Sequence, residues 1–216
     1  MARPPLSAVP IDEHGWWPAA RRYDSPNFNA RPAGSAITLV VLHNISLPAG
    51  EFGGPHIADL FTNRLDFSAD ASFASLRGVE VSSHFLVRRD GAVIQFVSCD
   101  ERAWHAGMSA FEGRENCNDF SVGIEIEGSD FIAFSAAQYD AVSVLINVLL
   151  ARYPIVAVQG HEHIAPGRKS DPGPYFDWSK IQEKSNVQAA TLVSANRPRT
   201  AASELSKVKW PHVDLG

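Results

Sequence analysis

The chain has 216 residues, of which 45% are hydrophobic and 20% are charged, a composition typical of a globular protein rather than a disordered or fibrous one. This length fits one domain with a single hydrophobic core. The net charge of −5, without a run of Lys and Arg, disfavours the basic surface that binds phosphates, so we expect no nucleic acid partner.

The N-terminal residues and the two cysteines indicate the cellular compartment of the protein. Cys99 and Cys117 alone do not indicate a disulfide framework, and they permit a reducing compartment. The first ten residues hold three prolines and one arginine and lead into Asp12 and Glu13, so they lack the apolar segment of a signal peptide. No later run approaches the roughly 18 apolar residues of a membrane span. We therefore expect a cytoplasmic protein without a membrane partner.

Composition shifts predict three regions. Residues 1–35 are rich in Pro, Arg and Asn, which favours an extended lead-in packed on the domain. Residues 36–182 are expected to form the domain itself. Residues 183–216 are polar and Ala-rich without a clean period, so we expect a flexible C-terminal tail.

Short apolar and β-branched runs predict the strands of a central sheet. Residues 37–42 are typical of a strand that is buried on both faces. Residues 85–88 and 93–97 flank an Asp-Gly pair, which is a hairpin signal. In residues 120–127 apolar side chains alternate with glycine and glutamate, so two carboxylates project from the same face of the predicted strand. A last buried strand is predicted over residues 155–158.

Two segments have the pattern of helices. The clearer helix begins at Ser135, where Ser-Ala-Ala-Gln has the form of a capping box, and it ends near Arg152, before Pro154. A short helix is predicted near residues 57–64. Strands and helices that interleave in this way indicate an α/β fold, and we expect a single domain with a mixed central sheet flanked by helices on both faces.

The most informative segment is residues 159–173, QGHEHIAPGRKSDPG, which follows the last predicted strand. Imidazole and carboxylate groups bind zinc, and a catalytic zinc typically has three protein ligands and one open position. His161 and Asp171 are candidates for two ligands. His43 is the best placed third candidate, because it ends the first predicted strand and strand ends deliver side chains to a cleft.

Four segments together resemble a known family. They are LVVLHNISLPAGEFGG, RAWHAG, CNDFSVGIEIEG and GHEHIAPGRKSDPGP. In this order they are similar to the zinc-dependent N-acetylmuramoyl-L-alanine amidases, most closely to the cytoplasmic type that acts on 1,6-anhydro muropeptides. The resemblance runs from about Gly15 to Trp178. It implies a fold like that of amidases and peptidoglycan-recognition proteins, one zinc ion per chain, and hydrolysis of the lactyl amide between the muramic acid sugar and L-alanine in peptidoglycan recycling.

The resemblance also implies the metal ligands, which are His43, His161 and Asp171. His161 and His163 compete, because in an extended segment they would point to opposite sides. The family motif places Lys eight residues and Asp ten residues after the ligand histidine, and this spacing selects His161. Without the resemblance, Asp171 would be read as a turn aspartate that accepts backbone hydrogen bonds.

Three further charged residues are assigned by the same resemblance. Glu125 matches the Gly-Ile-Glu block and is expected to be the general base and acid. Lys169 is expected to stabilise negative charge on the scissile carbonyl, although most lysines are solvated surface charges. Glu127 is expected either to support the site residues or to be exposed to solvent.

Substrate contacts are predicted from the remaining blocks. The family lines its groove with the Trp-His-Ala-Gly block, so Trp104 and His105 are expected to contact substrate, with a tryptophan face stacked on a sugar. The alternative for both is a place in the core. Asn44 is expected to donate a hydrogen bond to substrate.

These predictions define a substrate and a rival function. A cytoplasmic enzyme meets turnover fragments rather than intact cell wall, so the expected partner is an anhydromuramyl peptide, bound by a monomer. The rival is a non-catalytic module that recognises peptidoglycan fragments, since relatives of this fold bind them after losing metal ligands. A zinc enzyme that cleaves a different amide is a second alternative.

Overall fold

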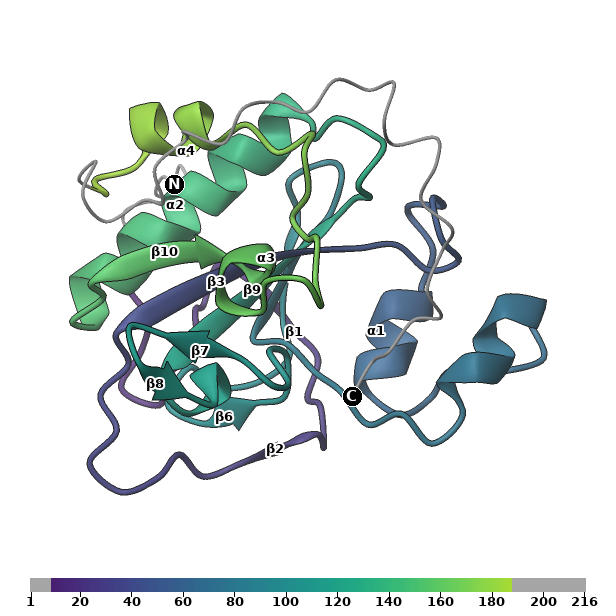
Figure 1. Ribbon diagram of the computed structural model, residues 1–216, viewed down its shortest axis with the longest axis horizontal. Coiled ribbons are helices and arrows are strands. Elements are labelled where there is room, and N and C mark those ends of the chain that lie inside the picture. The colour runs from purple at the N-terminus through teal and green to yellow at the C-terminus, as the bar shows by residue number, and fades with distance from the viewer. Residues whose placement is uncertain (1–8, 188–216) are drawn as a thin grey trace, which may run out of the picture.

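The computed structural model describes residues 9–187, and residues 1–8 and 188–216 lie outside this range. Figure 1 shows a central sheet with helices packed against it. The sheet has six strands in the order β1, β5, β4, β9, β3 and β10. Their bounds are β1 (Arg21–Arg22), β3 (Leu39–Ile45), β4 (Phe85–Val87), β5 (Val93–Gln95), β9 (Ser121–Glu127) and β10 (Ala157–Gly160).

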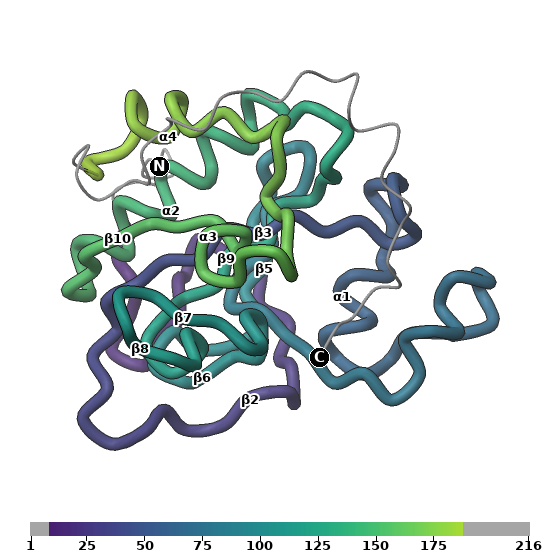
Figure 2. The backbone as a smooth tube through the Cα atoms, viewed as in Figure 1, coloured from purple at the N-terminus to yellow at the C-terminus, as the bar shows by residue number. Residues whose placement is uncertain are grey.

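Strand directions make the sheet mixed, as predicted. β4 and β5 form the predicted antiparallel hairpin, whereas β4, β9, β3 and β10 run parallel to one another. At the edge of the sheet opposite β10, β1 pairs in parallel with β5. Figure 2 shows how the N-terminal segment reaches β5, which lies far from it in the sequence. Parallel central strands are covered on both faces, which agrees with their near-continuous apolar sequences.

The remaining elements are short, apart from one helix. Two small ribbons pair β2 (Phe28–Asn29) with β6 (Arg102–Ala103) and β7 (Ala110–Phe111) with β8 (Arg114–Glu115). The α-helices are α1 (His56–Phe61), α2 (Ala136–Arg152), α3 (His161–Ile164) and α4 (Trp178–Lys184). Two 3-10 helices are η2 (Ala71–Leu76) and η3 (Cys117–Asp119).

Helix α2 begins with the capping box that the sequence predicts. The Ser135 hydroxyl accepts the backbone N–H of Gln138, and the Gln138 side-chain oxygen accepts the N–H of Ser135. Each bond satisfies an N–H group that the first helical turn leaves unpaired. The Gln138 amide also donates to the carbonyl of Glu127, 2.8 Å away, which ties the helix to the end of β9.

Three apolar clusters cover the two faces of the sheet. On one face, α2 and α4 pack on the even-numbered residues of β3 and β9, including Val40 and Ile124. On the other face, one cluster surrounds α1 and includes Leu86 of β4. A separate cluster on that face joins Val41 to Phe120 and Ile164. Residues of both of these last two clusters, including Phe61 and Ala106, line one cavity.

The structure corrects some predicted boundaries. β3 extends to Ile45, because its parallel pairing with β9 continues through the Ile45–Glu127 pair, so His43 lies inside the strand rather than at its end. Helix α4 passes residue 182, and Val187 is buried in the core. The rest of the predicted tail, residues 188–216, lies outside the described residues.

The N-terminal segment is attached to the domain through Trp17. This side chain is buried, and its indole N–H donates to the carbonyl of Val9 at 2.8 Å. None of the helices within residues 9–187 has the length and apolar character that a membrane crossing requires.

Candidate active site

The two central strands place His43 beside Glu125. These residues are direct partners in the parallel pairing of β3 with β9. Successive side chains of a strand alternate between faces. Because Leu42 and Ile124 belong to the cluster under α2, His43 and Glu125 face the opposite side of the sheet.

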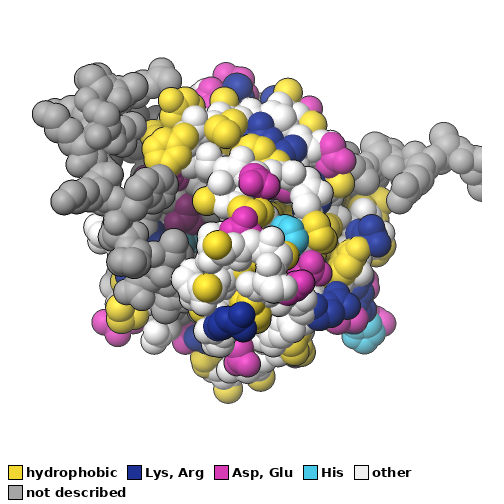
Figure 3. Space-filling view, turned by 90° about the vertical axis from the view of Figure 1, so that its right-hand side faces the viewer, with side chains coloured by type: hydrophobic (Ala, Val, Ile, Leu, Met, Phe, Trp, Pro, Cys, Tyr) yellow, Lys and Arg dark blue, Asp and Glu magenta, His cyan; other side chains and the backbone are white. Residues whose placement is uncertain are grey.

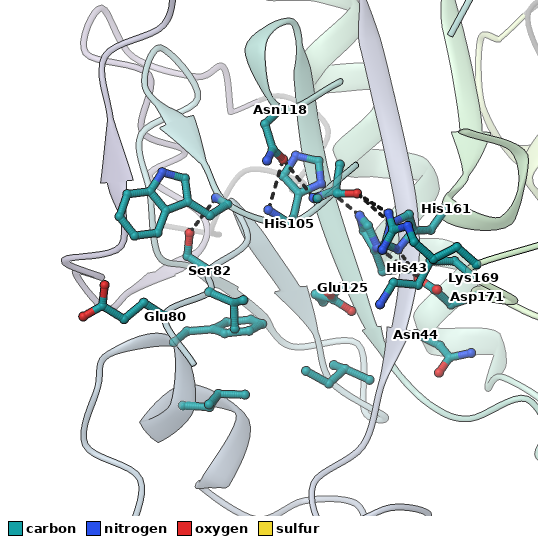
Figure 4. A pocket seen from close by; sticks show the side chains of 18 residues that line it. His43, Asn44, Glu80, Ser82, His105, Asn118, Glu125, His161, Lys169 and Asp171 are labelled. Carbon is teal, nitrogen blue, oxygen red and sulfur yellow. Dashed lines mark hydrogen bonds and ion pairs between the residues drawn. The ribbon is translucent and has the colours of Figure 1, made fainter. Parts of the chain in front are cut away.

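Three potential metal ligands converge at this position, as the sequence predicts (Figure 4). The Nδ1 atom of His43 lies 3.0 Å from Nδ1 of His161 and 3.0 Å from Oδ2 of Asp171. His161 Nδ1 and Asp171 Oδ2 are 3.1 Å apart. Ligands at about 2.0–2.1 Å from a tetrahedral zinc would be separated by about 3.3 Å, so the set fits one such ion with a slight expansion.

The protonation of His161 also fits a cation. Its Nε2 lies 3.0 Å from the carbonyl oxygen of Ala106, which can only accept, so Nε2 carries the hydrogen. In the tautomer that carries its hydrogen on Nε2, the Nδ1 lone pair of His161 points at the carboxylate of Asp171. Two electron-rich atoms held this close repel each other unless a positive charge lies between them.

The pKa directions of the other two ligands agree with this picture. Burial, followed by the neighbouring His161, lowers the pKa of His43 to about 4, so the ring is neutral at physiological pH. Burial alone would raise the pKa of Asp171, but the contacts of its carboxylate with the rings of His161 and His43 outweigh burial and hold that pKa below its usual value. A neutral imidazole and an ionised carboxylate are the forms that bind a metal.

His163 is directed away from this cluster, although not for the predicted reason. Residues 161–164 form the short helix α3 rather than an extended segment. The Nδ1 atom of His163 accepts the backbone N–H of Gly160 at 2.9 Å, and its ring packs against Trp178 with a centroid separation of 5.6 Å. His163 therefore caps the start of α3 and joins it to α4.

Glu125 is buried beside the ligand cluster and lines the same cavity as Lys169. Its Oε2 atom has no hydrogen-bond partner among the described residues. Burial first, and the charge of Asp171 second, raise the pKa of Glu125 well above its usual value, against the opposing influence of Lys169. A carboxyl with these properties is suited to exchange a proton near neutral pH.

Glu127, two residues further along β9, is a structural anchor. Oε1 accepts the backbone N–H of Gly53 at 2.7 Å, and Oε2 accepts the N–H of Arg89 at 3.0 Å. Arg88 lies 3.6 Å from the same carboxylate and donates to the carbonyls of Gly53 and Gly54. These bonds hold the loop that follows β3.

The cluster lies at one end of an open cavity of about 420 Å³. In Figure 4, Lys169 lies beside the ligands and Glu80 lies toward the other end. Trp104 lines the cavity, and its indole N–H donates to Asn29 at 2.8 Å, which fixes the ring. An apolar wall is formed by Leu60 and Phe61 of α1. This combination of apolar walls and a few polar groups is typical of a ligand site.

Asn44 and His105, which were expected to contact substrate, also make hydrogen bonds within the protein. Both line the cavity, but the Asn44 amide donates to Asp130 at 2.7 Å and to the carbonyl of Pro172 at 3.2 Å. The ring nitrogens of His105 lie 3.0 Å from His43 and 3.2 Å from Ser121. The amide N–H₂ group of Asn44 and both ring nitrogens of His105 are therefore engaged within the protein.

Two residues that support the site were not identified from the sequence. Asp130 accepts hydrogen bonds from Asn44 and from Ser170, which adjoins the candidate ligand Asp171. The Asn118 side chain accepts the backbone N–H groups of His105 and Ala106, at 3.1 and 2.8 Å. Both lie in the segments that resemble the family or just after them, but only the folded chain reveals these partners.

Comparison with known proteins agrees with this arrangement. The chain matches the model of the N-acetylmuramoyl-L-alanine amidase family over residues 33–174. It is 51% identical over 174 residues to the 1,6-anhydro-N-acetylmuramyl-L-alanine amidase AmpD of Citrobacter freundii, covering 80% of this chain and 92% of that one.

Solved structures give the same result for the fold. A crystal structure of a selenomethionine derivative of AmpD superposes with a TM-score of 0.78 at 50% identity, covering 80% of this chain and 98% of that one. AmpDh3 of Pseudomonas aeruginosa, solved in complex with an anhydromuramic pentapeptide, gives a TM-score of 0.52 at 28% identity and covers 75% and 66% of the two chains. The predicted α/β fold is confirmed.

Proposed function

Because this chain belongs to the N-acetylmuramoyl-L-alanine amidase family, we propose that it hydrolyses the lactyl amide joining N-acetyl-1,6-anhydromuramic acid to L-alanine in muropeptides. The observation that carries this proposal is the convergence of His43, His161 and Asp171 beside the buried carboxyl of Glu125, at the end of an open cavity. A module that only recognises fragments would not need this set.

The metal is proposed to be a single zinc ion, held by Nδ1 of His43, Nδ1 of His161 and a carboxylate oxygen of Asp171. Two imidazoles and one carboxylate form a three-ligand set of the kind found in catalytic zinc sites. When bound, zinc supplies a Lewis acid that polarises a carbonyl oxygen and lowers the pKa of water.

Glu125 is the proposed proton carrier. Its unpartnered oxygen would accept a proton from the attacking water, and burial raises its pKa, which favours the protonated form that donates in the next step. The same group then donates the proton to the alanine amine as the C–N bond breaks, so one proton moves from water to the leaving group. No covalent intermediate with the protein is required.

Lys169 is proposed to stabilise the negative charge that develops on the carbonyl oxygen. It lines the same cavity as Glu125, and its charge acts on that carboxyl and on His43. A cation held near the reacting carbonyl acts on the transition state more than on the neutral substrate.

The substrate is proposed to be an anhydromuramyl peptide, the ligand class named for the Pseudomonas relative. Trp104 offers an aromatic face on the cavity wall for the sugar. On the face shown in Figure 3, Lys and Arg are interspersed with Asp and Glu, an arrangement that suits a small ligand better than a polyanion. We also propose a cytoplasmic location and a monomeric state; the three candidate ligands and Glu125 converge within one chain, so the site requires no residue from a second copy.

The test is mass spectrometry of anhydromuramyl tripeptide after incubation with zinc-loaded protein. We expect the intact tripeptide and the free sugar as products, and their loss in a chelator. Cleavage inside the peptide would identify a different amidase. Unchanged peptide, bound equally well with and without chelator, would identify a recognition module and reject the proposed function.

A further inference from the structure

A chain of hydrogen bonds leads from His43 away from the cavity. Nε2 of His43 lies 3.0 Å from Nδ1 of His105, and Nε2 of His105 lies 3.2 Å from the hydroxyl of Ser121. The Ser121 hydroxyl lies 2.6 Å from the carbonyl oxygen of Cys117. His43, Ser121 and Cys117 are buried and His105 is partly buried, which limits the competition of water for these bonds.

The last group in the chain sets the direction of the hydrogens. The Cys117 carbonyl can only accept, so it takes the one hydrogen of the Ser121 hydroxyl. The Ser121 oxygen must then accept from Nε2–H of His105. In the neutral ring of His105 this leaves Nδ1 as an acceptor, and it takes Nε2–H of His43.

This order determines which nitrogen of His43 is free. With its hydrogen on Nε2, the neutral His43 ring presents a lone pair at Nδ1. That atom faces Nδ1 of His161 and Oδ2 of Asp171 at 3.0 Å each. The hydrogen bond at the far nitrogen thus fixes the tautomer and the ring orientation that a metal ligand needs.

The backbone around His105 is shaped to hold its ring in this place. A Cβ atom at Gly123 of β9 would lie 2.5 Å from Cγ of His105, so only glycine leaves room for the ring against the strand. The side chain of Asn118 accepts the backbone N–H groups of His105 and Ala106, which fixes the loop that carries the ring. Two independent features therefore serve the position of this side chain.

We propose that His105 is a positioning residue, which presets His43 for the metal through the Ser121 hydroxyl and the Cys117 carbonyl. This inference rests on the proposed metal site. It gives His105 a role other than the predicted contact with substrate, so that the Trp-His-Ala-Gly block has two roles. Trp104 serves the groove, and His105 serves the metal ligand.

The experiment compares His105→Phe with His105→Asn. Phe keeps the ring but removes the acceptor, whereas the side-chain oxygen of Asn replaces Nδ1 as an acceptor. Zinc affinity is measured by competition with a chromogenic chelator, with melting temperature as the control for folding. We expect zinc affinity to fall about 10- to 100-fold in His105→Phe, the usual effect of losing such a partner, and to recover largely in His105→Asn.

Two results would overturn the inference. One is wild-type zinc affinity in His105→Phe, and the other is an equal loss in both variants, because the acceptor would then not be the property that matters. Wild-type protein that binds no zinc would instead reject the proposed metal site.

A second readout does not depend on zinc or on a variant that folds. Long-range ¹H–¹⁵N spectra of the metal-free wild-type protein report which ring nitrogen carries hydrogen. We expect His43 protonated at Nε2 and His105 protonated at Nε2. Hydrogen on Nδ1 of His43 would overturn the inference.

Discussion

Glu125 and Glu127 lie on the same face of the same strand, and both are buried, yet their surroundings are opposite. Glu127 uses both oxygens to hold backbone N–H groups of Gly53 and Arg89. Glu125 leaves one oxygen without a partner and turns toward the cavity. One carboxylate stabilises the scaffold, while the other is buried with an unpartnered oxygen, which fits the chemical role proposed for it.

The two histidines of the metal-binding segment show the same contrast. His161 directs Nδ1 at the other ligands, whereas Nδ1 of His163 caps the helix on which both residues lie. Residue type does not separate the members of either pair, and burial does not separate the two glutamates. The difference is whether the polar atoms of a side chain are satisfied by the scaffold or are left facing the site.

The sharpest test of the comparison is Glu125→Gln, which removes the proton carrier but keeps the shape of the side chain. We expect kcat to fall by about 100-fold or more, the size associated with an acid/base group, while zinc content stays at the wild-type level. The measurement is kcat on anhydromuramyl tripeptide together with metal analysis. Near-normal turnover would move the catalytic role to another group.

The matched substitution is Glu127→Gln, which should act on stability instead. The substitution places an amide N–H₂ group against a backbone N–H that donates to a carboxylate oxygen in the wild type. We expect a loss of about 1–3 kcal/mol in the free energy of unfolding, with kcat within severalfold of wild type. Chemical denaturation measures the first quantity. A large loss of kcat with unchanged stability would reverse the assignments of the two carboxylates.

His163→Ala extends the comparison to the histidine pair with a smaller expected effect. Loss of the bond to the Gly160 N–H and of the contact with Trp178 should lower the free energy of unfolding by about 1 kcal/mol. Zinc affinity should stay close to wild type, because this ring does not face His43, His161 and Asp171, the proposed ligands. A strong loss of zinc would show that His163 is a ligand.

The smallest expected effect is a pH dependence of stability in metal-free protein. Burial raises the pKa of Glu125, so folded protein holds a proton here after the unfolded chain has released it. The stability contributed by this group is present at low pH and is lost as pH rises from the unfolded pKa, about 4.3, through the folded one. Glu125→Gln should therefore melt higher than wild type by a margin that grows from pH 4 to pH 8. A constant or shrinking margin would contradict the raised pKa.

Local sequence patterns predicted the larger elements because each depends on neighbours in the chain. The capping box at Ser135 and the hairpin over residues 85–97 require only residues a few positions apart. The two-residue strands β1 and β2 were not predicted, since they exist only through pairing with β5 and β6, more than 70 residues later. Likewise, nothing in the histidine-rich segment indicated that residues 161–164 form a helix.

The site likewise divides into features that were predicted from the sequence and features that were not. The ligand set His43, His161 and Asp171 was predicted from the resemblance, and the structure brings its three atoms together. The partners of Asn44 and His105 were not predictable, because they depend on how side chains from distant segments are oriented. Asn44 meets Asp130, 86 positions away, and His105 meets His43, 62 positions away.

The most direct test of the central claim is the metal content of purified protein, measured by mass spectrometry of the elements. Wild type and His163→Ala should each contain one zinc ion per chain after loading and removal of free metal, and His161→Ala should contain almost none. Equal zinc in His161→Ala, or no zinc in the wild type, would contradict a metal site built from His43, His161 and Asp171.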